Sequence, residues 1–354
     1  MSKKAIIAMS GGVDSSVAAF LMKKKEYECI GATMKLYDND DIAADTEKTC
    51  CSLDDIEDAR AVARRLSMPY YVFNFKDEFK EKVIDKFIST YENGGTPNPC
   101  IDCNRHLKFE KLFERMNELQ FDYVVTGHYA KVEERNGWFY LKKAKDHKKD
   151  QSYVLYSLTQ NQLAHILFPL GEYSKPEIRE IAESEGFLNA TKRDSQDICF
   201  VTDGDYAKFI ESYTGKKYPA GNFVDIHGNV IGRHQGIIRY TNGQRKGLGV
   251  AFGKPMYVAD KNIENNTVTL CTNEELFSTE LFADNFNWLV PDISSPIRCK
   301  ARVRYNMSEQ DATAYIIDEN KVKVVFDNPQ RAVTKGQAVV LYDEDIVLGG
   351  GTIL

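Results

Sequence analysis

The feature that most constrains the fold is a glycine loop near the start of the 354-residue chain. The apolar run over Lys4–Met9 predicts a buried strand, and the pattern over Ser15–Lys24 predicts a helix. Between them lies SGGVDS, whose two glycines let the backbone come close to an anion. A helix that begins there directs N–H groups and the positive end of its dipole at bound phosphate. The Ser10, Ser15 and Ser16 hydroxyls can add hydrogen bonds. This strand–loop–helix unit therefore predicts a phosphate site.

The loop matches neither the GxxxxGK[ST] pattern of the Walker A loop nor the GxGxxG pattern of dinucleotide-binding folds. It resembles the PP-loop of the N-type ATP pyrophosphatases, which cleave ATP between the α- and β-phosphates and adenylate an oxygen of the substrate. A glycine turn that only connects strand to helix is the simpler interpretation, which the strand–loop–helix context disfavours. Asp14 can help to hold Mg²⁺ or can cap the helix, and the sequence leaves both roles open.

Strands and helices alternate through the first half of the chain. Further strands are predicted over Glu28–Leu36, Tyr70–Phe75 and Tyr123–Thr126, and helices over Ser52–Ser67, Asp77–Tyr91 and Lys108–Leu119. Such alternation predicts a parallel sheet with helices on both faces. The segment Gly94–Asn104 carries two prolines and is predicted to be an irregular loop.

The pattern changes in the second half. A hairpin is predicted to turn at Asn136-Gly137, two or three short helices over 152–187, and mostly β structure from Tyr218. The predicted fold is an α/β N-terminal domain (1–205) with a parallel sheet of the PP-loop ATPase type. A small central domain (206–275) and an all-β, barrel-like C-terminal domain (276–354) follow.

Bulk properties indicate a cytoplasmic protein without membrane contact. No apolar run is long enough to cross a bilayer, and the N-terminal apolar stretch runs into a glycine loop instead of a signal-peptide cleavage site. In a reducing compartment the eight cysteines are not expected to form a structural disulfide framework. Cys29, Cys271 and Cys299 lie in apolar runs and are predicted core residues, whereas Cys50 and Cys51 are predicted loop thiols.

The remaining cysteines suggest sulfur chemistry. Cys100 and Cys103 form a CxxC in the proline-rich loop, and Cys199 lies in DSQDICF. Adenylation turns a carbonyl oxygen into a leaving group that sulfur can displace, and a thiolate is the most nucleophilic side chain. One cysteine can carry a persulfide, and a second can attack it, release sulfide and leave a disulfide; Cys103 and Cys199 would serve if the fold brings them together.

A second sulfur chemistry is compatible with the same residues. Cys100, Cys103 and Cys199 can ligate three irons of a cubane iron–sulfur cluster whose fourth iron binds sulfide. A single CxxC also occurs in redox pairs and in halves of zinc sites, so no metal site is assigned from the sequence.

Several motifs along nearly the whole chain resemble those of the bacterial tRNA-specific 2-thiouridylase family. They are AMSGGVDSS (8–16), GGTPNPCIDCNRHLKF (94–109), TGHYA (126–130), KDQSYVLYSL (149–158), DSQDICF (194–200), TNGQRKGLG (241–249), RVRYN (302–306) and TKGQAVVLY (334–342). The resemblance implies 2-thiolation of the wobble uridine of tRNA with ATP and Mg²⁺, with AMP and pyrophosphate as products. A sulfur-relay protein or sulfide would be the sulfur donor.

The resemblance also implies residue roles. ATP would be bound by Ala8, Met9, Ser10, Gly11, Gly12, Val13, Asp14, Ser15, Met34 and Gly127. The target base would contact Asn98, Pro99 and Cys100, with Cys103 as nucleophile and Cys199 as persulfide carrier. The tRNA would contact His128, Lys149, Asp150, Gln151, Arg304, Tyr305 and Gln337. Some family members carry Asp where Cys100 stands, so the nucleophile role cannot depend on Cys100.

Basic residues offer further sites for RNA although the net charge is -6. A run of lysines (142, 143, 145, 148 and 149) can neutralise phosphates, or can be a solvated charged turn. Arg302 and Arg304 are predicted to alternate along one strand and share a face. Two other functions stay open. One is a PP-loop ligase that acts on a small molecule, and the other is a non-enzymatic redox or metal module, which the SGGVDS loop disfavours.

Overall fold

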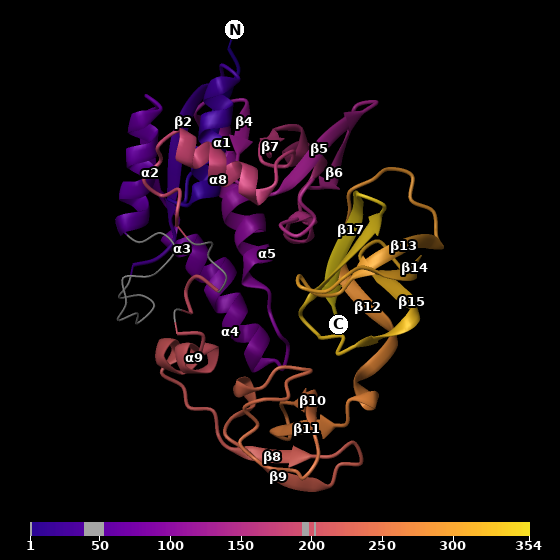
Figure 1. Cartoon of the computed structure of the whole chain (residues 1–354). Helices are drawn as coiled ribbons and strands as arrows, with labels where there is room; N and C mark the ends of the chain where they lie inside the picture. The colour runs from indigo at the N-terminus through magenta and orange to yellow at the C-terminus, as the bar shows by residue number, and fades with distance from the viewer. Residues whose placement is uncertain (1, 39–52, 193–197, 202) are drawn as a thin grey trace.

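The computed structural model describes residues 2–38, 53–192, 198–201 and 203–354. Figure 1 shows an α/β part formed by the N-terminal half, a small β part below it and a β-barrel beside both. This arrangement confirms the predicted fold class. Cys50, Cys51 and Ser52, the first residue of the helix predicted over Ser52–Ser67, lie outside the described residues.

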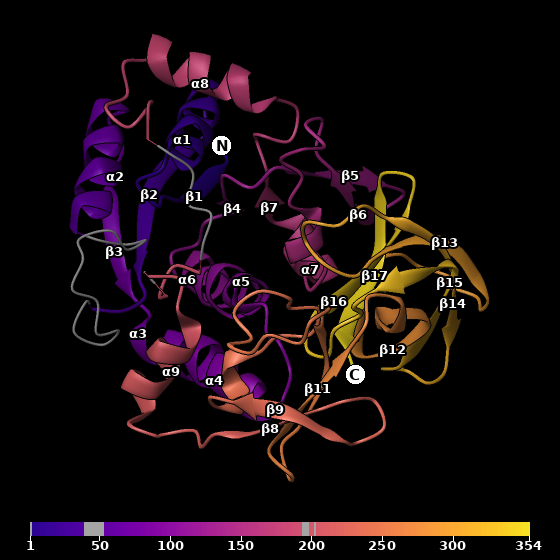
Figure 2. The ribbon, with the colours of Figure 1, turned by 60° about the horizontal axis from the view of Figure 1, so that its bottom comes forward.

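A five-stranded parallel sheet forms the centre of the N-terminal part. Its order is β3 (Tyr70–Asn74), β2 (Glu28–Lys35), β1 (Lys4–Ala8), β4 (Tyr123–Val125) and β7 (Ile166–Leu167). Side chains of β1 alternate between the two faces, as the period of a strand requires. Ala5 and Ile7 pack with α1 (Val13–Lys24), α2 (Leu53–Arg65) and α8 (Lys175–Ser184), and α8 lies beside α1 (Figure 2). Ile6 packs on the other face.

The helical segments between β3 and β4 include one that the sequence analysis missed. A nearly continuous helix is built from α3 (Lys76–Phe79), η2 (Lys80–Ile84) and α4 (Asp85–Glu92). After a short connection come α5 (Pro99–Cys103), η3 (Asn104–Lys111) and α6 (Leu112–Glu118). The predicted irregular loop over Gly94–Asn104 is therefore wrong from Pro99 onward. Pro99 occupies the first helical turn, where its missing N–H has no intrahelical partner to lose.

The hairpin predicted at Asn136-Gly137 is confirmed. It joins β5 (Ala130–Arg135) to β6 (Trp138–Lys143), and both turn residues have positive φ, 53° and 79°. The predicted short helices follow as η4 (Ser152–Leu155), α7 (Gln160–Ala164) and α8. A capping box formed by Ser174 and Glu177 begins α8.

The second half is mostly β structure, as predicted. After α9 (Tyr206–Thr214), the central sheet contains β8 (Gly221–Val224), β9 (Val230–His234), β10 (Tyr257–Asn262) and β11 (Thr267–Cys271), with η5 (Ile237–Arg239) and η6 (Glu274–Leu276) beside it. The barrel strands are β12 (Phe277–Trp288), β13 (Ile297–Arg302), β14 (Gln310–Ile316), β15 (Val322–Arg331), β16 (Ala338–Asp343) and β17 (Ile346–Ile353). Pairing of β12 with β17 closes the barrel, and β6 joins it through β17.

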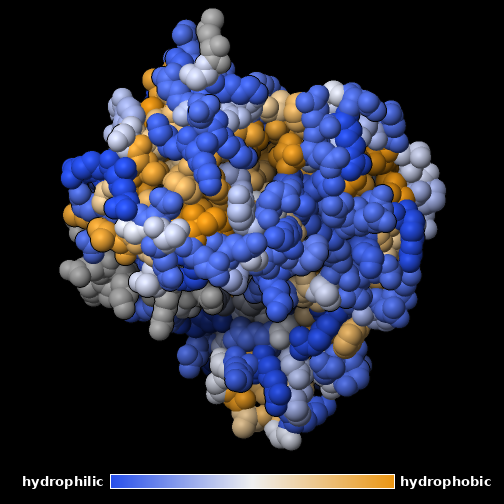
Figure 3. Space-filling view, turned by 45° about the horizontal axis from the view of Figure 1, so that its top comes forward, coloured by the Kyte–Doolittle hydropathy of each residue, from blue (hydrophilic) through white to orange (hydrophobic). Residues whose placement is uncertain are grey.

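Three cysteines predicted to lie in cores, Cys29, Cys271 and Cys299, are buried. The prediction that Arg302 and Arg304 share a strand is wrong, because β13 ends at Arg302 and the chain bends at the next residues. None of the helices in the described parts of the chain has the length and apolarity to span a membrane. Figure 3 shows hydrophilic residues over most of one face, with hydrophobic residues visible between them on the N-terminal part.

Candidate active site

The glycine loop lies at the point where the sheet changes its winding direction. From β1 the sheet continues to β2 on one side and to β4 on the other. The carboxyl ends of such neighbouring strands form the usual ligand crevice of an open α/β sheet. Gly127, just after β4, meets the loop there: a Cβ on Gly127 would lie 2.9 Å from both the Asp14 carbonyl carbon and the Ser15 nitrogen. The structure thus brings together two segments expected to bind ATP.

Serine hydroxyls hold the loop in shape. Ser15 Oγ and Ser16 Oγ each donate to the Gly12 carbonyl at 3.0 Å, and Ser15 Oγ accepts from the Ser10 N–H at 3.2 Å. Gly11 has φ +72°, and a Cβ there would lie 2.4 Å from the Asp55 carbonyl oxygen. Ser15 and Ser16 are buried and Ser10 is exposed, so Ser10 is the hydroxyl of the three that faces outward.

Asn189 is a loop contact that the sequence analysis missed. It is buried, and its Nδ2 donates to the Gly11 carbonyl at 2.8 Å and to Ser16 Oγ at 2.9 Å. These bonds tie the glycine loop to a segment far along the chain. No local sequence pattern near Asn189 signals this contact.

The expected ATP residues on β1 and β2 are also neighbours. Met9 N–H donates to the Ala32 carbonyl at 2.8 Å, and Thr33 Oγ1 donates to the Met9 carbonyl at 2.6 Å. Met34 follows on β2 and is buried. The carboxyl ends of these two strands therefore form one continuous wall beside the loop.

Asp14 is held by two side chains that the sequence analysis also missed. Lys175 Nζ lies 2.8 Å from each carboxylate oxygen of Asp14, and Tyr129 OH donates to Oδ1 at 2.7 Å. Lys175 is 7% exposed and is the first residue of α8. The Asp14 carboxylate thus neutralises a buried ammonium at the loop, a role that neither alternative from the sequence included. The Ser174–Glu177 capping box predicts the start of α8, but nothing local points to Asp14.

The candidate cysteines approach one apolar cluster. Cys100 is exposed and Cys103 half-buried on α5. Cys199 is half-buried, and Tyr37 OH donates to its carbonyl at 2.9 Å. Cys103 and Cys199 both pack against the cluster that contains Phe79, Phe87 and Phe200. Residues 96 positions apart in sequence therefore share one environment.

Comparisons with known proteins identify the family. Three family models match consecutive parts of the chain: the tRNA methyl transferase HUP domain (3–203), the tRNA methyl transferase PRC-barrel domain (207–272) and the aminomethyltransferase beta-barrel domain (278–353). The tRNA-specific 2-thiouridylase MnmA of Clostridioides difficile (strain 630) is 52% identical over 100% of this chain and 98% of its own length. That of Clostridium kluyveri is 51% identical over 100% and 99%. The chain belongs to the MnmA family.

A solved structure adds less. A 4-thiouridine synthetase–RNA complex with bound ATP aligns with a TM-score of 0.36 at 18% identity, over 60% of this chain and 50% of that chain. This likeness is too low to carry an argument. Membership of the MnmA family rests on the full-length relatives and the three family models.

Several tRNA contacts implied by the MnmA resemblance are buried here. His128 is 8% exposed, bonds to Thr126 Oγ1 at 2.7 Å and packs against Phe109 and Phe168. Burial holds the pKa of His128 well below its ordinary value, so the ring is neutral near pH 7. In this structure His128 therefore supports the strand end beneath the surface.

The segment that follows β6 is also tied inward. Asp150 is 5% exposed and accepts from the Ala144 N–H at 3.0 Å and the Ser152 hydroxyl at 2.7 Å. Burial raises the pKa of Asp150. Gln151 Oε1 accepts from the Tyr129 N–H at 2.9 Å, and Lys149 is half-buried. These hydrogen bonds hold the segment that follows β6 against the rest of the protein.

The MnmA-type contacts expected in the barrel link parts of the chain. Arg304 donates to the Asn242 carbonyl at 3.1 Å and to the Ala332 carbonyl at 2.7 Å. Gln337 reaches the connection before α5. Burial raises the pKa of Tyr305, whose hydroxyl donates to the Asp150 carbonyl at 3.4 Å, so Tyr305 lies beside the segment that follows β6.

The lysine run carries less unpaired positive charge than its sequence indicates. Lys142 pairs with Glu133 at 2.6 Å and with Asp345 at 3.2 Å, Lys143 pairs with Glu309, and Lys145 pairs with Glu177. Three of the five lysines are therefore matched by carboxylates, which reduces the local positive field. Lys142 and Lys143 lie on β6 with side chains only 14% and 12% exposed, so a solvated turn is wrong for these two, and their ion pairs leave little charge for phosphate. The exposed Lys145 fits a solvated charged position.

The cysteines do not assemble a metal site in the described residues. Across residues 2–38, 53–192, 198–201 and 203–354, no three His, Cys, Asp or Glu side chains gather closely enough to hold a metal ion. The placement of Cys100, Cys103 and Cys199 therefore adds no support to the cluster alternative, which stays a prediction. Nor does a disulfide join any two cysteines within those residues.

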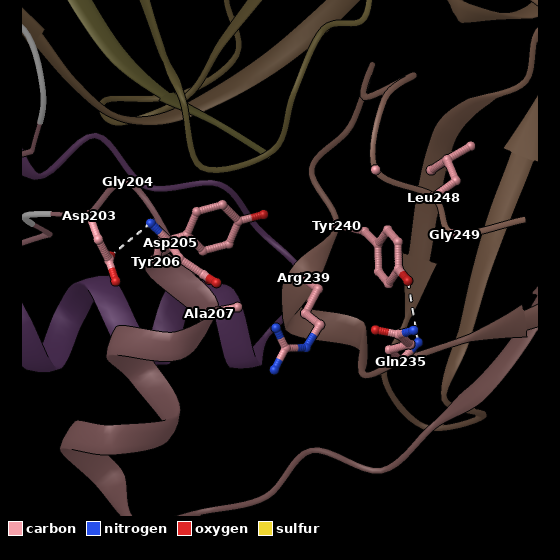
Figure 4. Close-up of a pocket in the computed structure, with 11 residues that line it drawn as sticks. Asp203, Gly204, Asp205, Tyr206, Ala207, Gln235, Arg239, Tyr240, Leu248 and Gly249 are labelled. Atoms are coloured by element: carbon pink, nitrogen blue, oxygen red, sulfur yellow. Dashed lines mark hydrogen bonds between the residues drawn. The ribbon is translucent and has the colours of Figure 1, made fainter.

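A cavity of about 380 Å³ lies just after Cys199, between the start of α9 and the central sheet (Figure 4). The lining segments are Asp203–Ala207, Gln235, Arg239–Tyr240 and Gly247–Gly249. Its polar groups mostly bind protein: Asp203 accepts from the Asp205 N–H at 3.0 Å, the Gln235 N–H donates to Tyr240 OH, and Arg239 pairs with Glu211. The sequence analysis did not anticipate this cavity, and its lining singles out no ligand.

Proposed function

We propose that this chain adenylates the C2 oxygen of the wobble uridine of tRNA with ATP and replaces that oxygen with sulfur. The observation that carries the proposal is a PP-loop at the sheet's switch point in a chain 52% identical, along its whole length, to a tRNA-specific 2-thiouridylase. The cysteines on α5 and after residue 198 supply the chemistry that such a reaction needs.

ATP would bind along Ala8–Ser15, with Met34 and Gly127 beside it. The α1 N-terminus favours the phosphates through its N–H groups and dipole. Lys175 adds an ammonium next to the loop, where it can stabilise the charge that develops on departing pyrophosphate. Mg²⁺, when bound, would neutralise phosphate charge. Both oxygens of Asp14, the carboxylate at the loop, already contact Lys175 Nζ, so Asp14 would hold the ion only after that pair opens.

The sulfur step would use Cys103 and Cys199. A sulfur-relay protein that carries a persulfide loads Cys199: the Cys199 thiolate takes the outer sulfur, and the relay cysteine leaves as a thiolate. Free sulfide, used as donor instead, would enter directly as the hydrosulfide of the later step. The Cys103 thiolate attacks the inner sulfur, so a Cys103–Cys199 disulfide forms and hydrosulfide leaves with the electron pair of the broken S–S bond. Hydrosulfide then attacks C2 of the adenylated uridine, and AMP departs with the oxygen. A cellular thiol reduces the disulfide. Support comes from the shared apolar cluster against which both cysteines pack.

The target base would meet Asn98, Pro99 and Cys100 at the start of α5. For the tRNA we retain His128, Lys149, Asp150, Gln151, Arg304, Tyr305 and Gln337 as proposed contacts. Several are buried in this RNA-free structure, so contact by His128 and Asp150 would need their segments to move. Three domains (1–205, 206–275 and 276–354) would divide adenylation from RNA binding, in the cytoplasm, where ATP and tRNA meet.

The test is thiolation of unmodified tRNA by the purified protein with ATP, Mg²⁺ and sulfide, followed by mass spectrometry of the nucleosides. We expect 2-thiouridine, and none when ATP is omitted. Pyrophosphate release that needs no RNA, without 2-thiouridine, would instead support a PP-loop ligase that acts on a small molecule.

A further inference from the structure

The connection between α4 and α5 is held by side chains from both other parts of the molecule. Three successive carbonyls accept hydrogen bonds there. Lys261 Nζ, from β10 of the central sheet, donates to the Gly95 carbonyl at 3.3 Å. Gln337 is the residue before β16 of the barrel, and its Nε2 donates to the Thr96 carbonyl at 2.9 Å and the Pro97 carbonyl at 3.2 Å.

The barrel also approaches the connection through its backbone. The Thr96 N–H donates to the Lys335 carbonyl at 2.8 Å. Gly336 has φ +87°, and a Cβ there would lie 3.1 Å from both the nitrogen and the oxygen of Thr96. A side chain at position 336 would therefore be strained in its conformation and crowded against Thr96. In Figure 1 α4 extends toward the central sheet, and the chain returns to α5 on the side of the barrel.

A lysine is rarely buried, so a purely structural role would be unusual for Lys261. It is 7% exposed, and its Nζ also donates to the Tyr240 carbonyl at 2.8 Å and lies 5.7 Å from the centre of the Tyr91 ring. No carboxylate forms an ion pair with it among the described residues. Burying an ammonium that is paired only with neutral oxygens costs free energy. Its three donors suit it to hold backbone carbonyls from two separate segments at once.

The helix that begins with α5 follows directly on this connection. The five residues of α5 are the first part of a helix that continues without a break through η3 and α6, so the connection before Pro99 sets where this whole helix begins; the Asn98 side chain makes no capping hydrogen bond there. We propose that Lys261 and Gln337 are positioning residues that fix the Gly95–Pro97 carbonyls and thereby place α5, with Cys103, for sulfur transfer. The central and barrel parts would thus set the position of the nucleophile. The consequence for catalysis rests on the proposed function; the placement of α5 does not.

The first test measures the placement of α5 directly. The Cys103 alkylation rate by iodoacetamide, resolved by peptide mass spectrometry, is compared between wild type, Lys261→Met and Gln337→Glu, in the full chain without RNA. Glutamate matches glutamine in size but cannot donate to carbonyls when ionised. Each variant should raise the Cys103 rate about fivefold, the shift expected from losing one typical hydrogen bond. Lys254→Met, an exposed lysine of the same part, should leave it unchanged.

The second test separates positioning from general structural support. With saturating tRNA, Lys261→Met should lower kcat for thiolation about tenfold and leave KM for ATP within about twofold, whereas Lys261→Arg, which keeps the donors, should recover most of kcat. Unchanged Cys103 alkylation in both Lys261→Met and Gln337→Glu, with unfolding midpoints equal to wild type, would overturn the inference. If wild type forms no 2-thiouridine, the proposed function fails, but alkylation still decides whether the two side chains place α5.

Discussion

Replacing Lys261 with methionine should change how stability depends on pH. Burial lowers the pKa of Lys261 from 10.5 to about 8, while its neighbour Asp260 acts weakly in the opposite direction. The Tyr91 ring and the Tyr240 backbone carbonyl face the ammonium from the other segments. Between the two pKa values the unfolded chain binds more protons than the folded chain, so the Lys261 contribution to stability rises with pH.

The size of the change follows from the two pKa values. Integrating proton binding from about pH 7 to about pH 9.5 gives about 2 kcal/mol. The wild-type free energy of unfolding, minus that of Lys261→Met, should become more favourable to wild type by this amount. The hydrogen bonds lost in Lys261→Met lower its free energy of unfolding at both pH values, so their effect largely cancels when the two wild-type minus variant differences are compared. The other titrating groups are the same in both proteins, so their effect largely cancels too.

The assay is urea unfolding followed by circular dichroism at both pH values, for wild type, Lys261→Met and the control Lys254→Met. Wild type and Lys254→Met should show the same pH response. A wild-type minus Lys261→Met difference that stays constant within about 0.5 kcal/mol would mean that the protonation of Lys261 does not change with folding in this range. The reasoning from its burial would then be refuted.

The remaining predictions concern the glycine loop and the cysteines. Lys175→Met leaves the Asp14 carboxylate without its buried cation and should lower the free energy of unfolding by about 3 kcal/mol. The variant should also release pyrophosphate at least about tenfold more slowly. A variant that releases pyrophosphate at the wild-type rate would remove Lys175 from adenylation. Gly127→Ala places a Cβ against the loop backbone and should weaken ATP binding, measured by calorimetry, at least about tenfold; unchanged affinity would show that the loop can yield. With a persulfide-carrying sulfur donor, Cys103→Ala and Cys199→Ala should each abolish 2-thiouridine while ATP still binds, and product from either variant would exclude that cysteine.

Features built from neighbouring residues were predictable from the sequence. The strand–loop–helix at SGGVDS, the hairpin at Asn136-Gly137 and the start of α8 at Ser174 each depend on local periodicity, turn chemistry or capping. The alternation of strands and helices indicated the parallel sheet. The family motifs then indicated the chemistry of the site. The loop prediction over Gly94–Asn104 was wrong from Pro99 onward because a proline that is unfavourable inside a helix is favourable in its first turn.

Only the tertiary structure decided which distant groups meet. Lys175 pairs with Asp14 across 161 residues, and Gln337 reaches Thr96 across 241. The tertiary structure also decided that His128 and Asp150 are buried, although the family resemblance implied that both contact RNA. Such pairings carry no local pattern, because they depend on how the sheet, the central strands and the barrel pack together. The sequence by itself determined the strand–loop–helix at SGGVDS and which cysteines are candidates for sulfur chemistry. The packing of three parts around the connection before α5 decided how the segment that carries Cys103 is held.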